Sequence, residues 1–582
     1  MQVLRIANLK AIREICGMKI FLSQQNYHIG NFESNTRKII AAIEYAKSQG
    51  GELIVFSEMS VCGYPARDFV EFNDFINKCY NSIDEIKKHA DTIAVIVGSP
   101  ARNPSRDGKD LFNAAFFLYG QEIKAEIHKT LLPTYDVFDE YRYFEPAYEW
   151  KLVEFKGKKL AITICEDIWN INDNPLYRIC PMDQLMEQQP DLMINLSASP
   201  FDYAHDEDRK AVIKANVLKY KLPMFYCNAV GSQTEIVFDG ASYIFDKQGN
   251  LCKSFPLFEE ATEGVILHED GSIDSPVLET SASAPVTATA LLSLDEHLHT
   301  DQIYQALILG IRDYFTKMGF SKAIIGSSGG IDSAVTLALA VNALGKENVR
   351  AVLMPSPYST GHSVEDAVAL SKNLGNPYDL IRIDTVYHSL LDTLDPVFNK
   401  LPFSLAEENM QSRIRGNILM SIANKFGYIL LNTSNKSELS TGYGTLYGDM
   451  AGGLGVLGDL YKIQVYALAN YINQLHRNSG ITLIPLSIIE KAPSAELRPD
   501  QKDSDSLPDY AVLDKILFQY IEKRLGPDEI KALGFEAPLV DRVLKMVNSN
   551  EYKRNQFCPI IRVSPKAFGV GRRVPIVGKY LS

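Results

Sequence analysis

The chain has 582 residues, of which 46% are hydrophobic and 22% charged, so we expect two or three soluble domains rather than one core. Its formal net charge of −12 argues against a general role in binding nucleic acid or a membrane surface, although a local loop could still bind phosphate. Eight scattered cysteines without a CxxC pair, and no signal peptide or bilayer-length apolar run, indicate free thiols and a cytoplasmic location.

The first half of the chain alternates apolar runs with helical stretches. Residues 1–17 precede the first clear strand, and are either a short extra helix or an upstream extension of the reading frame. A helix is expected over 35–50, where apolar residues recur on one face before a glycine. The alternation predicts an α/β layered domain over 18–270. Runs rich in β-branched residues predict buried strands at 18–24, 52–58, 92–99, 159–166, 191–197 and 224–230.

The second half restarts this pattern after a change in composition. Residues 269–286 are rich in Ser, Pro and Ala without periodicity, which indicates a linker that we place at 271–293. In the domain that follows, 294–582, a strand ending in a glycine-rich turn is succeeded by a helix at 331–345 and a second strand. This order predicts a doubly wound parallel sheet, which binds ligands at the carboxyl ends of its strands.

Three side chains of the first domain suit nucleophilic catalysis. Glu58 ends one predicted strand, Cys165 follows another, and Lys129 lies between them in the chain. A nucleophilic cysteine must lose its proton, and Glu58 is a suitable base. Lys129 could hold that carboxylate in place and stabilise an oxyanion together with backbone N–H groups. Each residue alone is more often structural, so the prediction depends on their joint pattern.

Four ordered motifs, FSEMSVCGYPARDF, KTLLPTYDVFDEYRYF, ICEDIW and NLSASPF, resemble the nitrilase superfamily of amidases, in particular its glutaminase branch. The resemblance covers about residues 18–270 and implies a four-layer α-β-β-α sandwich. It also implies that Glu58 is the base, Lys129 the stabiliser and Cys165 the nucleophile of a reaction that releases ammonia through a thioester. Hydrolysis of another small amide remains open for this domain taken alone.

The glutaminase branch further implies glutamine contacts at Tyr135, at Ser199 and at the residue six positions after that serine. His205 stands there, where the family usually has Lys or Arg. Because neutral histidine is a weaker partner for the α-carboxylate of glutamine than a fixed cation, Arg209 is an alternative source of the charge.

A loop rich in glycine and serine, GSSGGIDS, occupies Gly326–Ser333 between a predicted strand and a helix. Its glycines let the backbone approach a phosphate, and its N–H and hydroxyl groups can surround the oxygens. The loop lacks the GK[ST] of a Walker motif, and its string SGGIDS resembles the signature of ATP pyrophosphatases. Those enzymes cleave ATP between its α- and β-phosphates to form adenylates, and Asp332 would then bind Mg²⁺.

Downstream segments at 407–420, 431–453, 458–466, 492–497 and 552–573 match the glutamine-dependent NAD synthetases in order. The resemblance implies ATP contacts at Gly326, Ser327, Ser328, Gly329, Gly330, Ile331, Asp332, Ser333, Thr433, Lys462 and Ser494. It implies deamido-NAD contacts at Asn409, Glu438, Tyr443, Gly444, Thr445, Leu446 and Lys553, and magnesium ligands at Asp332 and Glu438. Ser434 stands where the family has glycine, a change that we expect to be tolerated.

The two halves together resemble an enzyme that amidates deamido-NAD in an ATP- and Mg²⁺-dependent reaction, with ammonia from glutamine. The family also implies a homo-oligomer, with glutamine, ATP and deamido-NAD as its small-molecule partners. One alternative is another ATP-dependent amidotransferase, acting on XMP or aspartate, although those enzymes use different glutaminase folds. A second alternative is a non-catalytic scaffold, which the full set of catalytic residue types disfavours.

Overall fold

The computed structural model describes residues 17–105, 107–171, 176–274, 294, 299–477, 480–499 and 501–581. The chain divides into two compact units, and the main boundary falls between residues 290 and 291, inside the predicted linker. Two short segments, 202–204 and 234–236, also belong to the second unit. The linker itself and the first 16 residues lie almost entirely outside the described residues, so their predicted roles stay predictions.

The first unit contains two six-stranded sheets and a small two-stranded sheet, β10 (Val230–Gln233) and β11 (Ile236–Asp239). One large sheet has the spatial order β14 (Ala261–His268), β1 (Gly17–Gln24), β2 (Leu53–Phe56), β3 (Ala94–Arg102), β4 (Leu111–Tyr119) and β5 (Glu122–His128). The other has the order β13 (Leu251–Ser254), β12 (Tyr243–Phe245), β9 (Met224–Asn228), β8 (Leu192–Ser197), β7 (Lys158–Ile164) and β6 (Val153–Phe155).

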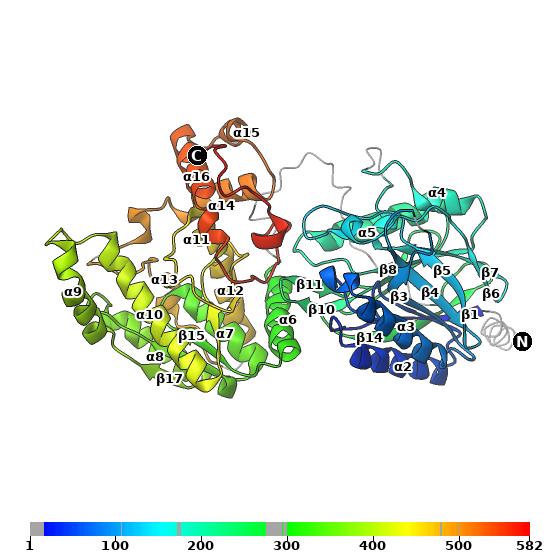
Figure 1. Cartoon of the computed structure of the whole chain (residues 1–582), viewed down its shortest axis with the longest axis horizontal. Coiled ribbons are helices and arrows are strands. Elements are labelled where there is room, and N and C mark those ends of the chain that lie inside the picture. The colour runs from blue at the N-terminus through cyan, green and yellow to red at the C-terminus, as the bar shows by residue number, and fades with distance from the viewer. Residues whose placement is uncertain are drawn as a thin grey trace, which may run out of the picture. The chain divides into compact units, whose positions relative to one another are not determined.

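Side-chain alternation along the strands produces the layers of this unit. In β1, Ile20 and Leu22 join a core shared with residues of β7, β8 and β9, so the two large sheets pack face to face. Phe21 points to the other face, where its ring meets that of Tyr45 on α2 (Phe32–Ser48). The helices α2 and α5 (His205–Tyr220) lie on opposite sides of the sheets (Figure 1). The predicted α-β-β-α sandwich is confirmed.

Two further helices complete the outer layers, α3 (Asn73–Lys87) beside β3 and α4 (Pro181–Met186) beside β7. All six strands expected in this half are present, with ends shifted by a few residues. The hairpin of β4 and β5 was not predicted. Because β5 is an edge strand with mostly polar, exposed side chains, it lacks the apolar run that marks a buried strand.

The second unit is built on a parallel five-stranded sheet. Its spatial order is β17 (Tyr378–Leu380), β16 (Val349–Leu353), β15 (Ala323–Gly326), β18 (Ile429–Asn432) and β19 (Leu454–Gly455). The chain moves outward in one direction from β15 and then returns to its other side at β18, so the strand order reverses between these two strands. This reversal confirms the doubly wound topology, and it places the loop after β15 where such sheets bind ligands.

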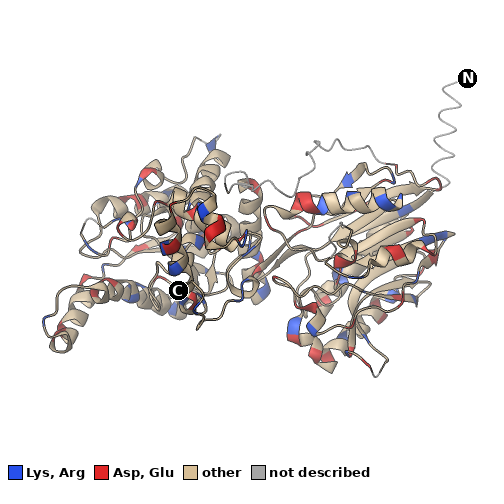
Figure 2. Cartoon of the chain, turned by 90° about the horizontal axis from the view of Figure 1, so that it is seen from above, with Lys and Arg blue, Asp and Glu red and all other residues tan. Residues whose placement is uncertain are grey.

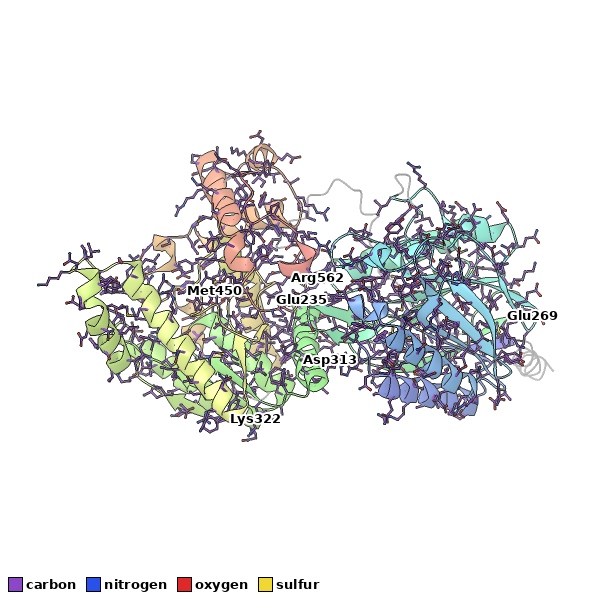
Figure 3. The ribbon with its side chains drawn as sticks, viewed as in Figure 1. Glu235, Glu269, Asp313, Lys322, Met450 and Arg562 are labelled. Carbon is purple, nitrogen blue, oxygen red and sulfur yellow. The ribbon has the colours of Figure 1, made fainter. Side chains whose placement is uncertain are left out.

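Helices surround this sheet, among them α6, which carries Asp313 (Figure 3), and α7, which follows the glycine-rich loop. None of the described helices is both long and apolar enough to cross a membrane. Acidic and basic side chains are interspersed along the helices of both units (Figure 2). The helices are α6 (Thr300–Met318), α7 (Ile331–Leu344), α8 (Gly361–Leu374), α9 (Asp384–Phe398), α10 (Leu405–Phe426), α11 (Lys436–Thr441), α12 (Lys462–Leu475), α13 (Leu486–Glu490), α14 (Tyr510–Ile521), α15 (Pro527–Ala532), α16 (Ala537–Ser549) and α17 (Glu551–Arg554).

Candidate active sites

The first candidate site lies where strands of the two large sheets end. Glu58 follows β2, Lys129 follows β5 and Cys165 follows β7, and all three side chains are buried. The Lys129 ammonium donates a hydrogen bond to Glu58 Oε1 at 2.7 Å. Burial raises the pKa of the Cys165 thiol, the Glu58 carboxylate adds to this rise, and the Lys129 charge opposes it. The three predicted residues therefore form one electrostatic cluster.

A second carboxylate, Glu140, belongs to this cluster and was missed by the sequence reasoning. It accepts hydrogen bonds from Lys129 Nζ and from the Tyr64 hydroxyl, both at 2.8 Å. Asn113 donates to Glu58 at 2.6 Å and to Glu140 at 3.3 Å, so it ties the two carboxyl groups together. Lys129 thus lies between two acidic groups, of which the sequence reasoning named only one.

Burial governs the charges in this cluster. Burial raises the pKa of Glu140 to about 7, and the nearby Glu58 carboxylate adds to the rise although Lys129 opposes it. For Lys129, burial alone disfavours the charged form, but Glu140 and Glu58 outweigh burial and raise the pKa of the ammonium well above its ordinary value. Lys129 is consequently a fixed cation at neutral pH.

The turn that presents Cys165 has an unusual backbone. Cys165 has a φ of +42°, a conformation that non-glycine residues seldom adopt and that often marks a functional turn. The carboxyl group of Asp167 holds this turn by accepting the backbone N–H of Ile164 at 3.0 Å. Its other oxygen accepts the N–H groups of Thr130 and Leu131 at 3.0 and 2.8 Å. Asp167 therefore fixes the turn that carries Cys165 against the segment that carries Lys129.

The predicted glutamine contacts lie around this turn. The Tyr135 hydroxyl donates to the Glu166 carboxylate at 2.9 and 3.0 Å, next to Cys165 in the chain. Ser199 Oγ lies 2.9 Å from His205 Nε2, and the His205 ring stacks on Trp169 with centroids 5.1 Å apart. The structure thus brings the predicted Ser199 and His205 together.

Arg209 does not supply the missing charge near Ser199. Its guanidinium is buried and makes a two-pronged ion pair with Asp239, at 2.9 and 2.6 Å. Asn228 connects Asp239 to Ser199. Its side-chain Nδ2 donates to Asp239 at 3.4 Å, and its Oδ1 accepts the backbone N–H of Ser199 at 2.8 Å. Arg209 therefore points into the interior of the unit, where its charge is neutralised by Asp239, a partner 30 positions away in the chain. The alternative proposed from the sequence is therefore wrong.

The second candidate site is a cavity of about 290 Å³ at the topological switch of the parallel sheet. The glycine-rich loop after β15 lines it, and Gly329 there has a φ of +78°. A Cβ at this position would lie 2.2 Å from the Ser363 carbonyl oxygen, so only glycine fits. Of the eleven predicted ATP contacts, ten line the cavity, namely Gly326, Ser327, Ser328, Gly330, Ile331, Asp332, Ser333, Thr433, Lys462 and Ser494.

Two predicted magnesium ligands border the cavity around a shared lysine. Lys462 Nζ lies 2.5 Å from Asp332 Oδ2 and 3.8 Å from Glu438 Oε1. Burial and the Asp332 charge raise the pKa of Glu438. Among the described residues no cluster of three His, Cys, Asp or Glu side chains could hold a metal by itself. Two hard carboxylates still fit Mg²⁺, which commonly takes one or two protein carboxylates together with substrate phosphates.

Most predicted deamido-NAD contacts form a cluster of their own. The Thr445 hydroxyl donates to Asn409 at 2.8 Å, and Lys553 Nζ donates to the carbonyls of Gly442 and Gly444 at 2.7 and 2.8 Å. Met450, labelled in Figure 3, packs beside Gly444, where an added Cβ would lie 3.1 Å from the Met450 Cγ atom. Of the seven predicted residues, Glu438 and Tyr443 also line the cavity. The cluster is therefore continuous with the cavity through α11 and the residues that follow it.

The departure at Ser434 is accommodated. Ser434 lines the cavity, and its backbone N–H donates to Asn432 Oδ1 at 2.7 Å. It is not among the residues with positive φ, so no backbone strain demands glycine there.

Comparisons with known proteins follow the same division of the chain. A family model described as carbon-nitrogen hydrolase matches residues 19–269, and one described as NAD synthase matches residues 303–557. A glutamine-dependent NAD(+) synthetase of Synechocystis is 43% identical over 96% of this chain and 98% of its own length. A protein of that name from Thermotoga maritima is 39% identical over 97% of this chain and 99% of its own.

Solved structures agree with these relatives. The glutamine-dependent NAD+ synthetase of Acinetobacter baumannii, determined in complex with ADP, matches with a TM-score of 0.74 and 37% identity. That match covers 96% of this chain and 98% of the other. An enzyme of the same name from Cytophaga hutchinsonii has a TM-score of 0.79 at 18% identity, which shows the fold alone. From the near-complete coverage and the identity, the chain belongs to the glutamine-dependent NAD(+) synthetase family.

Proposed function

We propose that this chain is a glutamine-hydrolysing NAD(+) synthase, which converts deamido-NAD to NAD at the expense of ATP with ammonia taken from glutamine. One observation carries the proposal. A chain with 43% identity to such an enzyme over nearly its full length holds a buried Cys-Glu-Lys cluster in one unit and a cavity lined by SGGIDS in the other. Neither site alone specifies the reaction, whereas the pair supplies both ammonia and an activated carboxylate.

In the proposed glutaminase half-reaction, Cys165 Sγ attacks the side-chain amide carbon of glutamine. Because the raised pKa of the thiol keeps it protonated at rest, attack requires Glu58 to take the proton as the sulfur–carbon bond forms. Lys129 holds Glu58 and favours the developing negative oxygen. The proton passes to the leaving nitrogen, ammonia departs, and water that gives its proton to Glu58 hydrolyses the thioester to glutamate.

Glutamine recognition is proposed at Tyr135, Ser199 and His205. The support is that the Ser199 hydroxyl and the His205 ring meet at 2.9 Å, and that Tyr135 contacts the residue next to the nucleophile. With Arg209 committed to Asp239, His205 is the proposed partner of the glutamine α-carboxylate.

In the proposed synthetase half-reaction, the carboxylate of deamido-NAD attacks the α-phosphorus of ATP and pyrophosphate leaves. Ammonia then attacks the resulting acyl adenylate, which releases AMP and NAD. The loop 326–333 would surround the phosphates, and Asp332 and Glu438 would hold Mg²⁺, which neutralises phosphate charge when bound. Asn409, Thr445 and Lys553 would bind the dinucleotide beside the cavity.

Three further features of the proposal concern the setting of the enzyme. The seven described cysteines are all free thiols, which supports a reducing, cytoplasmic compartment. A homo-oligomer is proposed on the resemblance to the family. The proposed partners are the small molecules named above, without nucleic acid or membrane.

The proposal is tested by supplying deamido-NAD, Mg-ATP and glutamine and measuring NAD, AMP and glutamate. We expect the three products in equal amounts when coupling is complete. Cys165→Ala should abolish synthesis from glutamine and retain synthesis from ammonium, because only the first half-reaction needs the thiol. Loss of the ammonium-supported reaction in that variant would contradict the assignment of the two half-reactions to separate sites. Assays with XMP or aspartate in place of deamido-NAD would reveal another carboxylate or carbonyl substrate.

A further inference from the structure

The cavity of the second unit contains an unusual balance of charges. Among the described residues, five acidic side chains line it, against three basic ones, Arg415, Lys462 and Lys491. Lys462 is paired with Asp332 at 2.5 Å, and Lys491 is paired with Glu496 at 2.8 Å. Arg415 differs from both lysines, because among the described residues it forms no ion pair and its hydrogen bond goes to a backbone carbonyl.

Among the residues that the structure describes, Arg415 makes one hydrogen bond in the cavity wall. It projects from α10, and its Nε donates to the backbone carbonyl of Met354, at the end of β16, at 3.0 Å. This bond fixes the plane of the guanidinium and leaves its two terminal nitrogens without a hydrogen-bond partner among the described residues. Burial lowers the pKa of Arg415, with Asp449 and Glu496 only partly offsetting the effect. Arg415 is half-buried, and a guanidinium in such a partly desolvated setting is stabilised when an anionic ligand binds it.

The neighbours of Arg415 on α10 show which part of the cavity it reaches. One turn later in the helix, Leu419 packs against Gly326, the start of the glycine-rich loop. Gln411, one turn earlier, donates to the carbonyl of Leu497 at 2.8 Å, at the end of the segment that contributes Ser494 to the cavity. Arg415 therefore lies on a helix face that joins the two main parts of the proposed ATP site.

A second polar group in this wall, the Ser327 hydroxyl, is also without a hydrogen-bond partner among the described residues. This hydroxyl is buried, and it too lines the cavity. A hydroxyl donor and a guanidinium fork in one cavity match the oxygens of a phosphate group.

We propose that Arg415 binds a phosphate group of ATP with the two terminal nitrogens of its guanidinium. This inference rests on the proposed function and names a residue that the sequence motifs did not single out. The carboxylate of deamido-NAD is the competing anion. ATP is favoured because ten of the eleven residues predicted for it line the cavity, whereas only two of seven do so for deamido-NAD.

The test uses the full chain with ammonium as the nitrogen source, so that the glutaminase site is not required. Arg415→Gln keeps a polar side chain of similar length but removes the charge. We expect its KM for ATP to rise by about ten-fold or more, because a charge-assisted contact is lost, while its KM for deamido-NAD stays within about two-fold. Lys425→Gln is the matched control, since it removes one positive charge from the exposed last turn of the same helix.

Direct binding separates this inference from the proposed function. Calorimetric affinity for Mg-ADP should fall by about ten-fold in Arg415→Gln and by less in Arg415→Lys, which keeps the charge and loses the fork. Unchanged ADP affinity with unchanged KM for ATP would overturn the inference, as would a rise confined to the KM for deamido-NAD. If Arg415→Gln does not fold by circular dichroism, Arg415→Lys is judged by the same criteria. Failure of the wild-type chain to form NAD would reject the proposed function, whereas the ADP affinities would still decide the role of Arg415.

Discussion

At the scale of single residues, Lys129 illustrates how burial and neighbouring charge set chemistry. A fully buried ammonium is costly unless it is paired, and here Glu58 and Glu140 pair with it at 2.7 and 2.8 Å. Two carboxylates against one lysine leave an excess of negative charge, which contributes to the rise of the Glu140 pKa to about 7 after the larger effect of burial. Burial and this excess of negative charge therefore bring the titration of Glu140 into the physiological range.

The first prediction concerns this titration. Ionised Glu140 holds Lys129, so glutamate release from glutamine should increase as the pH rises through about 7. Glu140→Gln should lose this acidic limb and reduce the rate at pH 8 by about 10². The measurement is the pH profile of kcat/KM for glutamine hydrolysis, with ammonium-dependent synthesis at pH 8 as the control for folding. An acidic limb that persists in Glu140→Gln would show that another group titrates.

The same shift has the opposite sign for stability. Because the Glu140 carboxyl has a higher pKa in the folded chain than its ordinary 4.5, the folded state holds its proton to higher pH than the unfolded state. Its contribution to the free energy of unfolding is therefore present below about pH 4.5 and is lost as the pH rises toward 7. Glutaminase activity and the contribution of Glu140 to stability are expected to change in opposite directions over this range.

The sequence revealed the proposed catalytic residues unevenly, for reasons that are local. Glu58, Lys129 and Cys165 follow strands, and polar residues at strand ends are recognisable by contrast with the apolar runs before them. Asn113 lies inside the apolar strand β4, and a lone amide in LFNAAFFLY is a signal that could have been used. Glu140 begins a short 3-10 turn among polar residues, so no periodic pattern distinguishes it.

At the scale of elements, the start of α5 is set by contacts distant in the chain. Arg209 lies one turn after His205 and joins α5 to Asp239, while Asn228 holds Ser199. No local pattern reveals this arrangement, because the partners are separated by 30 positions and lie on different strands and loops. That is why the sequence left a ligand-binding role open for Arg209 as an alternative to His205, whereas the structure gives it a buried partner.

The second prediction follows from that ion pair. Arg209→Met should lower the free energy of unfolding of the first unit by about 3 kcal/mol, since it leaves Asp239 buried and unpaired. It should also raise the KM for glutamine without changing the KM for ammonium, because Ser199 and His205 lose their support. Lys210→Met, next in the helix and partly exposed, is the control. An unchanged glutamine KM in a destabilised Arg209→Met would show that the pair is structural only.

The third prediction concerns the glycine-rich loop. Gly329 and Gly319 have similar φ values, +78° and +74°, but a Cβ would clash with Ser363 only at Gly329. Gly319→Ala should cost about 1 kcal/mol of stability from backbone strain alone. Gly329→Ala should cost more and should weaken Mg-ADP binding, because the loop must move away from α8. Chemical denaturation and calorimetry measure the two effects, and equal behaviour of the two variants would contradict the steric argument.

At the scale of the whole molecule, the chain combines two units with separate hydrophobic cores. One core lies between the large sheets of the first unit, and others lie within the second, among them a cluster around α14 and α16. The sequence predicted two α/β units and the doubly wound sheet of the second, because each unit repeats a strand–helix alternation that depends on nearby residues. The four-layer sandwich of the first unit was expected only from the resemblance to the nitrilase superfamily. The assignment of segments 202–204 and 234–236 to the second unit could not be predicted, since it depends on tertiary contacts alone.

The fourth prediction uses these separate cores. Mg-ADP should bind only in the cavity of the second unit, so it should stabilise that unit and leave the first unchanged. At a ligand concentration of about 100 Kd the gain is about 2.7 kcal/mol, which raises the temperature of one calorimetric transition. In Asp332→Asn the shift with Mg-ADP should shrink, because the cavity loses one of the two carboxylates proposed to hold the metal. Cys165→Ala should retain the full temperature shift with Mg-ADP, since the substituted residue lies in the first unit. A single transition that moves as a whole with Mg-ADP would show that the units unfold together, and a reduced shift in Cys165→Ala would show that the glutaminase site influences the nucleotide cavity.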